Sequence, residues 1–307
     1  MPVTEVDKIW MDGQLVDWKD AKVHVLTHAL HYGSGVFEGI RAYETTQGPA
    51  VFRLSDHLRR LARSAHIYHM EIPFSQGELH GAVRDTIRAN GLASCYVRPL
   101  VFRGYGEMGL NPLVAPVSVS IAVWKWGAYL GEDALDAGVR VKVSSWKRND
   151  NNSLPPAAKG TGQYINSSLA KMEAVKAGYD EAVMLNVHGY VTDGSGENVF
   201  VVRDGALATP PLADGCLEGI TRDSVMTIAR DLGYDVLERS LTRTDLYEAD
   251  EAFFTGTAAE LTPIREVDDR VVGSGQRGGV TKEIQQMFFA AARGELERYR
   301  AWNEPVG

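Results

Sequence analysis

Patterns typical of short strands alternate with patterns typical of amphipathic helices, and this alternation constrains the fold more than any other feature. In the second half of the chain, residues 139–146 alternate apolar and polar side chains as a half-buried strand does. The further strands expected in this half are 181–186, 198–203 and 251–255, and the expected helices are 165–177, 222–232 and one from about Thr281. The predicted fold class is α/β (α+β).

The first half mixes strands with two helices. Branched and aromatic residues predict strands at 23–26, 50–54, 95–103 and 117–124. One helix carries Leu58, Leu61 and Ala65 on one face, and Ser55 or Asp56 can cap it. A second helix, with Leu79, Val83 and Ile87, is expected to end at Asn90-Gly91.

A chain of 307 residues is expected to form two domains. Residues 126–138 lose periodicity and contain Gly127, Gly131 and Gly138, so this segment is predicted to be an inter-domain linker. We therefore expect a small N-terminal α/β domain at 1–125 and a larger C-terminal α/β domain at 139–307.

Charge and composition exclude several classes of protein. The formal net charge of -8 argues against nucleic acid or an anionic membrane as a partner. No run of 18 apolar residues and no signal-peptide pattern is present, so a cytoplasmic location is expected. Cys95 and Cys216 lack metal-ligand spacing, so no metal site is predicted and both thiols are expected to be reduced and buried.

Lys159 stands in the segment PPAAKGTGQY among small, uncharged residues. Without a carboxylate nearby, removal from water disfavours the ammonium form and makes a nucleophilic amine available. A lysine that forms a Schiff base needs this property. Gly160 and Gly162 would let the backbone bend closely around a bound group. An ordinary loop lysine is the alternative, and the other segments decide between the two.

Two turns have the composition of anion sites. The first, LEGIT at 217–221, directly precedes a helix, whose free N–H groups suit a phosphate; Thr221 could instead be only an N-cap. The second, TGTAA at 255–259, follows an apolar strand and could equally be an ordinary turn. Of Arg59, Arg60 and Arg63, two are expected to face solvent and one could complete a phosphate site.

The hairpin VTDGSGENVF at 191–200 holds two acids, Asp193 and Glu197, in a Gly/Ser turn. One interpretation is a hydrated hairpin tip, because Asp-Gly is a strong turn signal. The other is an acid held against a pyridine nitrogen, which keeps that nitrogen protonated.

Taken together, seven motifs in order resemble the branched-chain amino acid aminotransferases, which belong to fold type IV of the pyridoxal phosphate enzymes (D-amino acid aminotransferase-like). The motifs are HALHYG at 28–33, VFEGIR at 36–41, YVRPL at 96–100, AAK at 157–159 with Tyr164, GENVF at 196–200, GITR at 219–222 and GTAAE at 256–260. The resemblance runs from about Asp7 to the last helix. It implies two domains, pyridoxal 5'-phosphate as cofactor and a homo-oligomer, at least a dimer.

The resemblance also implies roles for individual residues. Lys159 would hold the cofactor's aldehyde and Tyr164 would meet its phenolic oxygen. The residues implied at the phosphate are Arg60, Leu217, Ile220, Thr221, Gly256 and Thr257. Those implied at the substrate are Tyr32, Phe37, Gly39, Tyr96, Arg98, Trp126, Tyr129, Thr257 and Ala258. The family usually has Glu where this chain has Asp193, so Glu197 stays a second candidate for the ring nitrogen.

The implied reaction is ping-pong transamination of leucine, isoleucine and valine with 2-oxoglutarate, giving 2-oxo acids and glutamate. Arg98 would meet the distal carboxylate of glutamate; alternatively it is part of a structural ion pair. D-amino acid aminotransferase, (R)-amine transaminase and aminodeoxychorismate lyase share the fold and remain open. A non-catalytic phosphate- or pyridoxal-binding protein is the alternative of another class.

Overall fold

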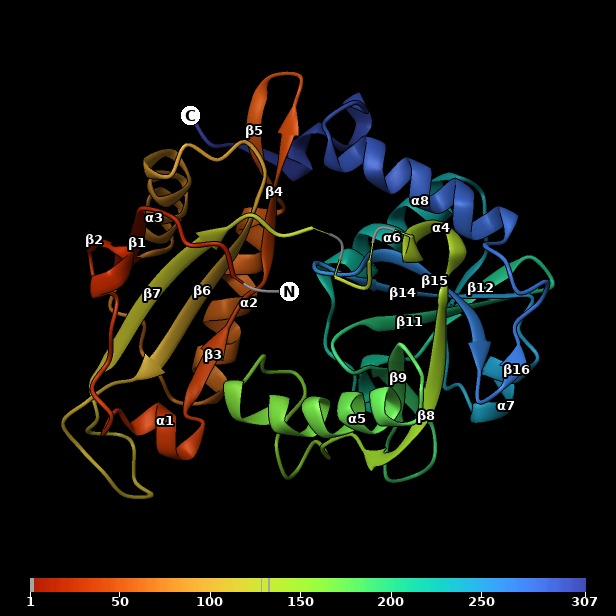
Figure 1. Ribbon diagram of the computed structural model, residues 1–307, viewed down its shortest axis with the longest axis horizontal. Coiled ribbons are helices and arrows are strands. Elements are labelled where there is room, and N and C mark those ends of the chain that lie inside the picture. Colours follow the sequence, from red (N-terminus) through yellow and green to blue (C-terminus); the bar gives the residue numbers. More distant parts are fainter. Residues whose placement is uncertain (1–2, 128, 132) are drawn as a thin grey trace. The chain divides into compact units, whose positions relative to one another are not determined.

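The computed structural model describes residues 3–127, 129–131 and 133–307, and its packing divides the chain into two compact units (Figure 1). Unit one comprises Met1–Trp126, Ala158–Gly162 and Ala290–Gly307, and unit two comprises Gly127–Ala157 and Gln163–Phe289. This division differs from the contiguous domains expected at 1–125 and 139–307, because two later segments pack with unit one. Residues 128 and 132 of the expected linker lie outside the described residues.

Unit one is built on a largely antiparallel sheet with the strand order β17-β5-β4-β6-β7-β1-β2, and β3 pairs with β6 (Figure 1). Its strands are β1 (Lys8–Met11), β2 (Gln14–Asp17), β3 (Gly35–Phe37), β4 (Ile40–Thr45), β5 (Gly48–Phe52), β6 (Cys95–Arg103), β7 (Val117–Trp124) and β17 (Asn303–Pro305). Because β17 pairs with β5, the C-terminal residues complete this sheet and belong to unit one.

The helices of unit one are α1 (His28–Tyr32), α2 (Leu54–Ile67) and α3 (Gln76–Ala89). The apolar faces of α2 and α3 supply Leu58, Leu61, Leu79 and Val83 to the same buried core as strand residues such as Val97. Burial of this apolar surface holds α2 against the sheet. It thereby places the polar side chains on the buried face of the helix.

Unit two is built on a mixed sheet with the strand order β10-β9-β8-β15-β14-β11-β12-β13, and β16 pairs with β15 (Figure 1). Its strands are β8 (Val139–Lys147), β9 (Glu181–Leu185), β10 (Val191–Gly194), β11 (Asn198–Arg203), β12 (Ala206–Thr209), β13 (Val236–Glu238), β14 (Glu251–Gly256), β15 (Glu260–Val267) and β16 (Arg270–Val271). The β8–β9, β8–β15 and β12–β13 pairs are parallel and the other described pairs are antiparallel.

The helices that begin in unit two are α4 (Ala134–Ala137), α5 (Tyr164–Lys176), α6 (Ile220–Asp231), α7 (Arg243–Tyr247) and α8 (Gly279–Ala292). Helix α5 packs on β8 and β9, and α6 packs on β14. None of the helices among the described residues is long and apolar enough to cross a membrane. Cys95 and Cys216 are buried free thiols, as expected.

The sequence predictions are accurate for the central strands. The ranges 95–103, 117–124 and 198–203 match β6, β7 and β11 residue for residue. Helix α3 ends at Ala89, with Asn90 as C-cap and Gly91 at a φ of 59°. The predicted helices at 165–177 and 222–232 lie within one or two residues of α5 and α6 at their ends.

Three local predictions are wrong. Residues 23–26 form no strand, and Val25 is 70% exposed because no neighbouring strand pairs with this segment. The predicted strand 50–54 lies at Gly48–Phe52, and neither Ser55 nor Asp56 caps α2. The helix instead begins at Leu54 after Arg53, whose φ is 53°, and Asp56 accepts a 2.6 Å hydrogen bond from Arg53.

Candidate functional site

Lys159 lies in the segment Ala158–Gly162, which is held in unit one by its backbone. The Lys159 N–H donates to Ser64 Oγ at 3.0 Å, and its carbonyl accepts from the Phe37 N–H at 3.0 Å. The Lys159 Nζ lies 5.1 Å from the centroid of the Phe37 ring. The lysine is therefore positioned by α2 on one side and by the end of β3 on the other.

Gly160 lies close to the side chain of Tyr68. A Cβ at this position would lie 2.3 Å from the Tyr68 Oη, well inside van der Waals contact. Gly160 also forms a β-bridge with Val36. Any larger residue here would push the segment that carries Lys159 away from Tyr68.

Arg98, on β6, lies among aromatic rings. Its guanidinium carbon is 4.7 Å from the Phe37 centroid, 5.2 Å from Tyr96 and 5.6 Å from Trp124. It donates a 3.2 Å hydrogen bond to the Tyr96 hydroxyl, while its buried Nε has no hydrogen-bond partner among the described residues. Within the described part of the chain no ion pair of Arg98 is found, so these residues give no support to the interpretation as a structural ion pair.

The predicted substrate residues of unit one gather around Arg98, with one exception. Trp126 packs on Tyr96 at 4.4 Å between ring centroids. Gly39 lies beneath Tyr96, where a Cβ would be 1.9 Å from the Tyr96 Oη. Tyr32 lies apart on α1, is 44% exposed, and contacts the ring of His28 at 4.6 Å.

Tyr129, in unit two, lies 5.4 Å from the Nζ of Lys171 by its ring centroid. Tyr164 is the first residue of α5 and is half-buried. Thr257 and Ala258 form the turn that follows β14, and both are half-buried. These residues stay predictions for the phenolic oxygen and the substrate carboxylate.

The three arginines of α2 divide as the sequence predicts. Arg59 and Arg63 are exposed, whereas Arg60 is buried. Arg60 donates from Nε and Nη2 to the two oxygens of Glu38, at 2.7 Å and 2.8 Å. Glu38 also forms a 2.7 Å hydrogen bond with His57 Nδ1.

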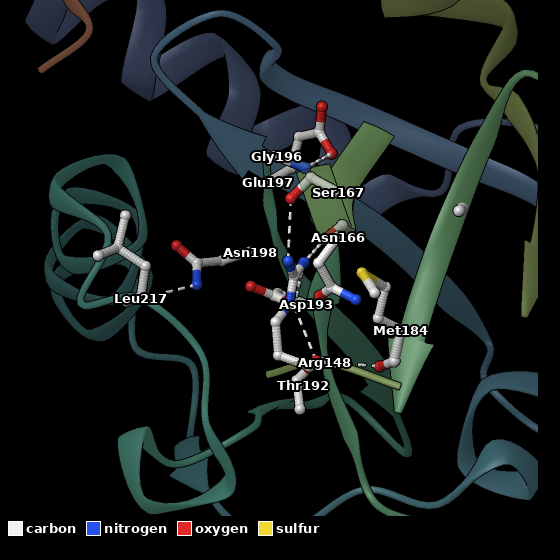
Figure 2. Close-up of polar contacts among 12 residues, drawn as sticks. Arg148, Asn166, Ser167, Met184, Thr192, Asp193, Gly196, Glu197, Asn198 and Leu217 are labelled. Atoms are coloured by element: carbon white, nitrogen blue, oxygen red, sulfur yellow. Dashed lines mark hydrogen bonds and ion pairs between the residues drawn. The ribbon is translucent and has the colours of Figure 1, made fainter. Parts of the chain in front are cut away.

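In unit two the hairpin acids are buried, so the hydrated-tip interpretation is wrong; Asp193 and Glu197 are 8% and 5% exposed. Figure 2 shows the Arg148 guanidinium between Asp193 and Ser167. Arg148 Nε donates to Asp193 Oδ1 at 2.8 Å and Nη1 donates to Ser167 Oγ at 2.9 Å. The Thr192 hydroxyl donates to the same Asp193 oxygen at 2.7 Å.

Glu197 has a different electrostatic environment. Burial and the negative charge of Glu181 raise the pKa of the Glu197 carboxyl to about 8. One oxygen accepts a 3.0 Å hydrogen bond from the Gly196 N–H. At neutral pH Glu197 is therefore largely protonated, whereas Asp193 is held in an ion pair with Arg148.

Asn198 joins the two predicted anion turns of unit two. It pairs with Thr255 across β11 and β14, and its Nδ2 donates to the Leu217 carbonyl at 3.0 Å (Figure 2). Helix α6 begins at Ile220 after Gly219, so no side chain caps its first N–H groups. Thr221 is the second residue of this helix, which excludes the N-cap interpretation.

The donor set suits a phosphate. The first N–H groups of α6 lie at the positive end of the helix dipole. The buried Thr255 Oγ1 has no hydrogen-bond partner among the residues described, and Thr255 directly precedes the turn at 256–259. The residues present therefore fit the anionic part of the predicted cofactor.

Four of these residues were missed as functional candidates from the sequence. Glu38 and Asn198 lie inside the quoted motifs VFEGIR and GENVF, and His57 lies on the helix that carries Arg60, but the sequence analysis assigns no role to them. The signal was a charged or polar side chain within an apolar run, as in VFEGI at 36–40. Arg148 carried no comparable signal, because the residues around it, KRND at 147–150, are polar.

The comparisons identify the family. The family model described as "Amino-transferase class IV" matches residues 35–267. The chain belongs to the class IV aminotransferases. It is 52% identical over 298 residues to a branched-chain-amino-acid aminotransferase of Pseudomonas aeruginosa, and the match covers 97% of each chain.

Solved structures give the same result. The structure of the Escherichia coli branched-chain amino acid aminotransferase matches with a TM-score of 0.97 and 50% identity, covering 99% of this chain and 100% of that one. The T.th. branched-chain amino acid aminotransferase complexed with N-(5'-phosphopyridoxyl)-L-glutamate matches with a TM-score of 0.95 and 48% identity, covering 99% of each. The predicted fold class, a fold type IV α/β protein, is confirmed.

Proposed function

We propose that this chain is a pyridoxal 5'-phosphate-dependent aminotransferase that moves the amino group of leucine, isoleucine or valine to 2-oxoglutarate. Full-length identity of about half with enzymes of that name supports this substrate class. A related structure contains a phosphopyridoxyl-glutamate adduct, which supports both the cofactor and glutamate as a product.

The observation that carries the substrate assignment is the position of Arg98. The reaction needs one pocket that accepts an aliphatic side chain in one half and a carboxylate in the other. Phe37, Tyr96 and Trp124 provide apolar walls, and the guanidinium among them provides one positive charge. A buried carboxylate without a partner is costly, so 2-oxoglutarate needs this charge whereas leucine does not.

The donors that would hold the cofactor follow from the resemblance to the family. Arg60, Ile220, Thr221 and Thr257 would bind the phosphate, and Leu217 and Gly256 lie in the two turns. Tyr164 would orient the ring through its phenolic oxygen. When bound, the cofactor supplies an aldehyde that accepts the amino group and a ring that withdraws electrons from the substrate's α-carbon.

We assign the acid that faces the pyridine nitrogen to Asp193. Such an acid must be ionised to keep the nitrogen protonated. The ion pair with Arg148 supports an ionised Asp193, while the raised pKa of Glu197 argues against that residue. Arg148 also fixes the direction of the shorter aspartate side chain, which replaces the usual glutamate.

Lys159 performs the proton transfer. Its Nζ would accept the α-proton of the bound amino acid and donate it to the cofactor carbon that receives the amino group. The 2-oxo acid then leaves before 2-oxoglutarate enters, and the same residues act in the reverse direction to form glutamate. The aromatic walls around Phe37 limit access of water to Nζ.

A donor panel tests the proposal. The purified enzyme is assayed with 2-oxoglutarate and with L-leucine, L-isoleucine, L-valine, D-alanine and (R)-1-phenylethylamine as separate donors. We expect the three branched L-amino acids to give the highest kcat/KM. A preference for D-alanine or the amine would assign another class IV activity, and no turnover with any donor would contradict a transaminase.

We also propose that the enzyme is at least a homodimer. Exposed apolar side chains of unit one gather on two adjoining segments, 24–32 and 104–114, which are joined by the His28–Gly104 and His28–Gly109 hydrogen bonds. They include Val25, Leu30, Tyr32, Tyr105, Leu110, Leu113 and Val114. A surface of this kind is typical of a subunit interface. A monomeric mass by light scattering, in a sample that keeps full activity, would contradict this proposal.

A cytoplasmic location is part of the same proposal. Burial raises the pKa of both Cys95 and Cys216 to about 12, so both thiols are unreactive and neither forms a disulfide. Free thiols suit a reducing compartment. Cell fractionation followed by an activity assay tests the location.

A further inference from the structure

We infer that Glu38 and His57 are positioning residues for the cofactor phosphate, because they fix the guanidinium of Arg60 on the helix that also binds the backbone of Lys159. The inference rests on the proposed function, in which Arg60 binds that phosphate. It assigns a role in cofactor recognition to two residues that touch the cofactor only through a third.

The first argument is the geometry of the pair. Glu38 is fully buried and accepts from the Nε and Nη2 of Arg60 at 2.7 Å and 2.8 Å. A guanidinium is planar and carries five N–H groups in a fixed fork. Two bonds along one edge therefore set the plane of the group and the direction of the three remaining N–H groups, which is the requirement for binding a phosphate with defined geometry.

His57 locks the carboxylate from its other side. Burial is the largest influence on the pKa of His57 and lowers it, against the pull of the Glu38 carboxylate, so the ring is neutral at pH 7. Since the carboxylate can only accept, His57 Nδ1 carries the proton and donates to Glu38 at 2.7 Å. Burial opposes the ionisation of Glu38, but Arg60 and His57 outweigh it and hold the pKa of this carboxyl far below its usual range.

The second argument is the place of the trio in the fold. His57, Arg60 and Ser64 follow one another on the buried face of α2, at spacings of three and four residues. Ser64 binds the backbone N–H of Lys159, and Phe37, the residue before Glu38, binds its carbonyl. Helix α2 therefore carries Arg60 and, together with the end of β3, holds the backbone of Lys159.

The third argument is energetic. A buried ion pair gains little net stability, because desolvation of the two charges offsets their attraction. Apolar side chains at these positions would pack the core of unit one without that cost. A buried ion pair of Arg60 and Glu38, on and beside the helix whose Ser64 binds the Lys159 backbone, therefore indicates a role in binding rather than in folding.

The test compares pyridoxal 5'-phosphate with pyridoxal, which lacks the phosphate. Both ligands are titrated against the full chain freed of cofactor. The Kd for pyridoxal divided by the Kd for pyridoxal 5'-phosphate measures the contribution of the phosphate. The variants are Glu38→Gln, His57→Gln, Arg60→Gln and the double variant Glu38→Gln/Arg60→Gln. Glu44→Gln, an exposed position on β4, and Arg59→Gln, the exposed neighbour of Arg60, are matched controls.

We expect Glu38→Gln to reduce the ratio by about 10- to 100-fold, as removal of a residue that orients a ligand-binding group does. His57→Gln should reduce it less, and both controls should leave it unchanged. In the Arg60→Gln background, Glu38→Gln should change the ratio no further, because its effect passes through Arg60. Circular dichroism confirms that each variant is folded, and His57→Gln, which keeps both Glu38 and Arg60, tests the positioning role in the case in which Glu38→Gln is not folded.

Two failures are distinguishable. If the wild type shows no phosphate-dependent affinity, or if Arg60→Gln keeps that affinity, the role of Arg60 in the proposed function is wrong. If Arg60→Gln loses that affinity while Glu38→Gln and His57→Gln keep it, or if these two variants lose both ligands equally, only the positioning role is overturned.

Discussion

Replacing Arg98 by Gln should separate the two halves of the reaction. The guanidinium lies among three aromatic rings and has no carboxylate partner in the described part of the chain, so a bound dicarboxylate would be its counter-ion. Loss of one partner of a buried charge pair costs about 2–5 kcal/mol. The kcat/KM for 2-oxoglutarate should therefore fall roughly 30- to 5000-fold, at about 1.4 kcal/mol for each factor of ten.

The half-reaction with leucine should change far less. An aliphatic side chain has no charge to pair, and the variant loses only cation–π contacts that contribute about 0.5–1 kcal/mol at partly exposed sites. We therefore expect a change within about fivefold for leucine. Arg98→Lys keeps the charge without the planar fork, so its kcat/KM for 2-oxoglutarate should lie between those of Arg98→Gln and the wild type.

Single-turnover absorbance spectra measure both halves on the same protein. The enzyme is mixed first with leucine and, in a separate experiment, the aminated enzyme is mixed with 2-oxoglutarate. Arg59→Gln serves as the matched control, because its side chain is 66% exposed on α2. Equal losses in both halves of Arg98→Gln would refute the reasoning and would make Arg98 a general support of the pocket.

Three other predictions concern the acids and the pocket. Asp193→Asn should lower kcat far more than Glu197→Gln, since an amide cannot keep a pyridine nitrogen protonated; the reverse order in steady-state assays would move the contact to Glu197. Glu197→Gln should become more stable relative to the wild type as pH rises from about 5 to about 8. In the unfolded chain this carboxyl ionises near pH 4.3, but in the folded chain its pKa is about 8, so the wild type loses up to about 1.4 kcal/mol per pH unit, which urea unfolding would detect. Gly39→Ala should raise the KM for leucine at least about tenfold, because its Cβ would displace Tyr96; unchanged kinetics would show that the tyrosine moves freely.

Central strands with a strong apolar pattern were predictable from the sequence. Residues 95–103 and 198–203 are rich in β-branched and aromatic residues, and they form central strands with matching ends. Residues 23–26 have a similar local composition, yet they stay exposed because strand formation needs a pairing partner that local pattern does not reveal. The β1–β2 hairpin was not predicted, although the dipeptide Asp12-Gly13 at its turn is a sequence signal for a hairpin. Both residues adopt the positive φ values that such a turn requires.

The chemical groups of the site were predictable, but their supports were not. Lys159, Arg60 and Arg98 stand out by residue type or by motif. Arg148 approaches Asp193 from 45 positions away in the sequence, and only the β8–β9–β10 arrangement brings the two together. The assignment of the hairpin acids likewise depends on burial and on the charge of Glu181, which no local pattern encodes.

The central claim is that Lys159 carries the cofactor, and borohydride reduction followed by peptide mapping tests it most directly. The purified protein should be yellow, and reduction should fix one pyridoxyl group to the peptide that contains Lys159 and to no other. Lys147, which is exposed on β8, and Lys171, which is ion-paired with Glu181, serve as internal controls. A tag on either of them, or full turnover by Lys159→Ala, would contradict the account.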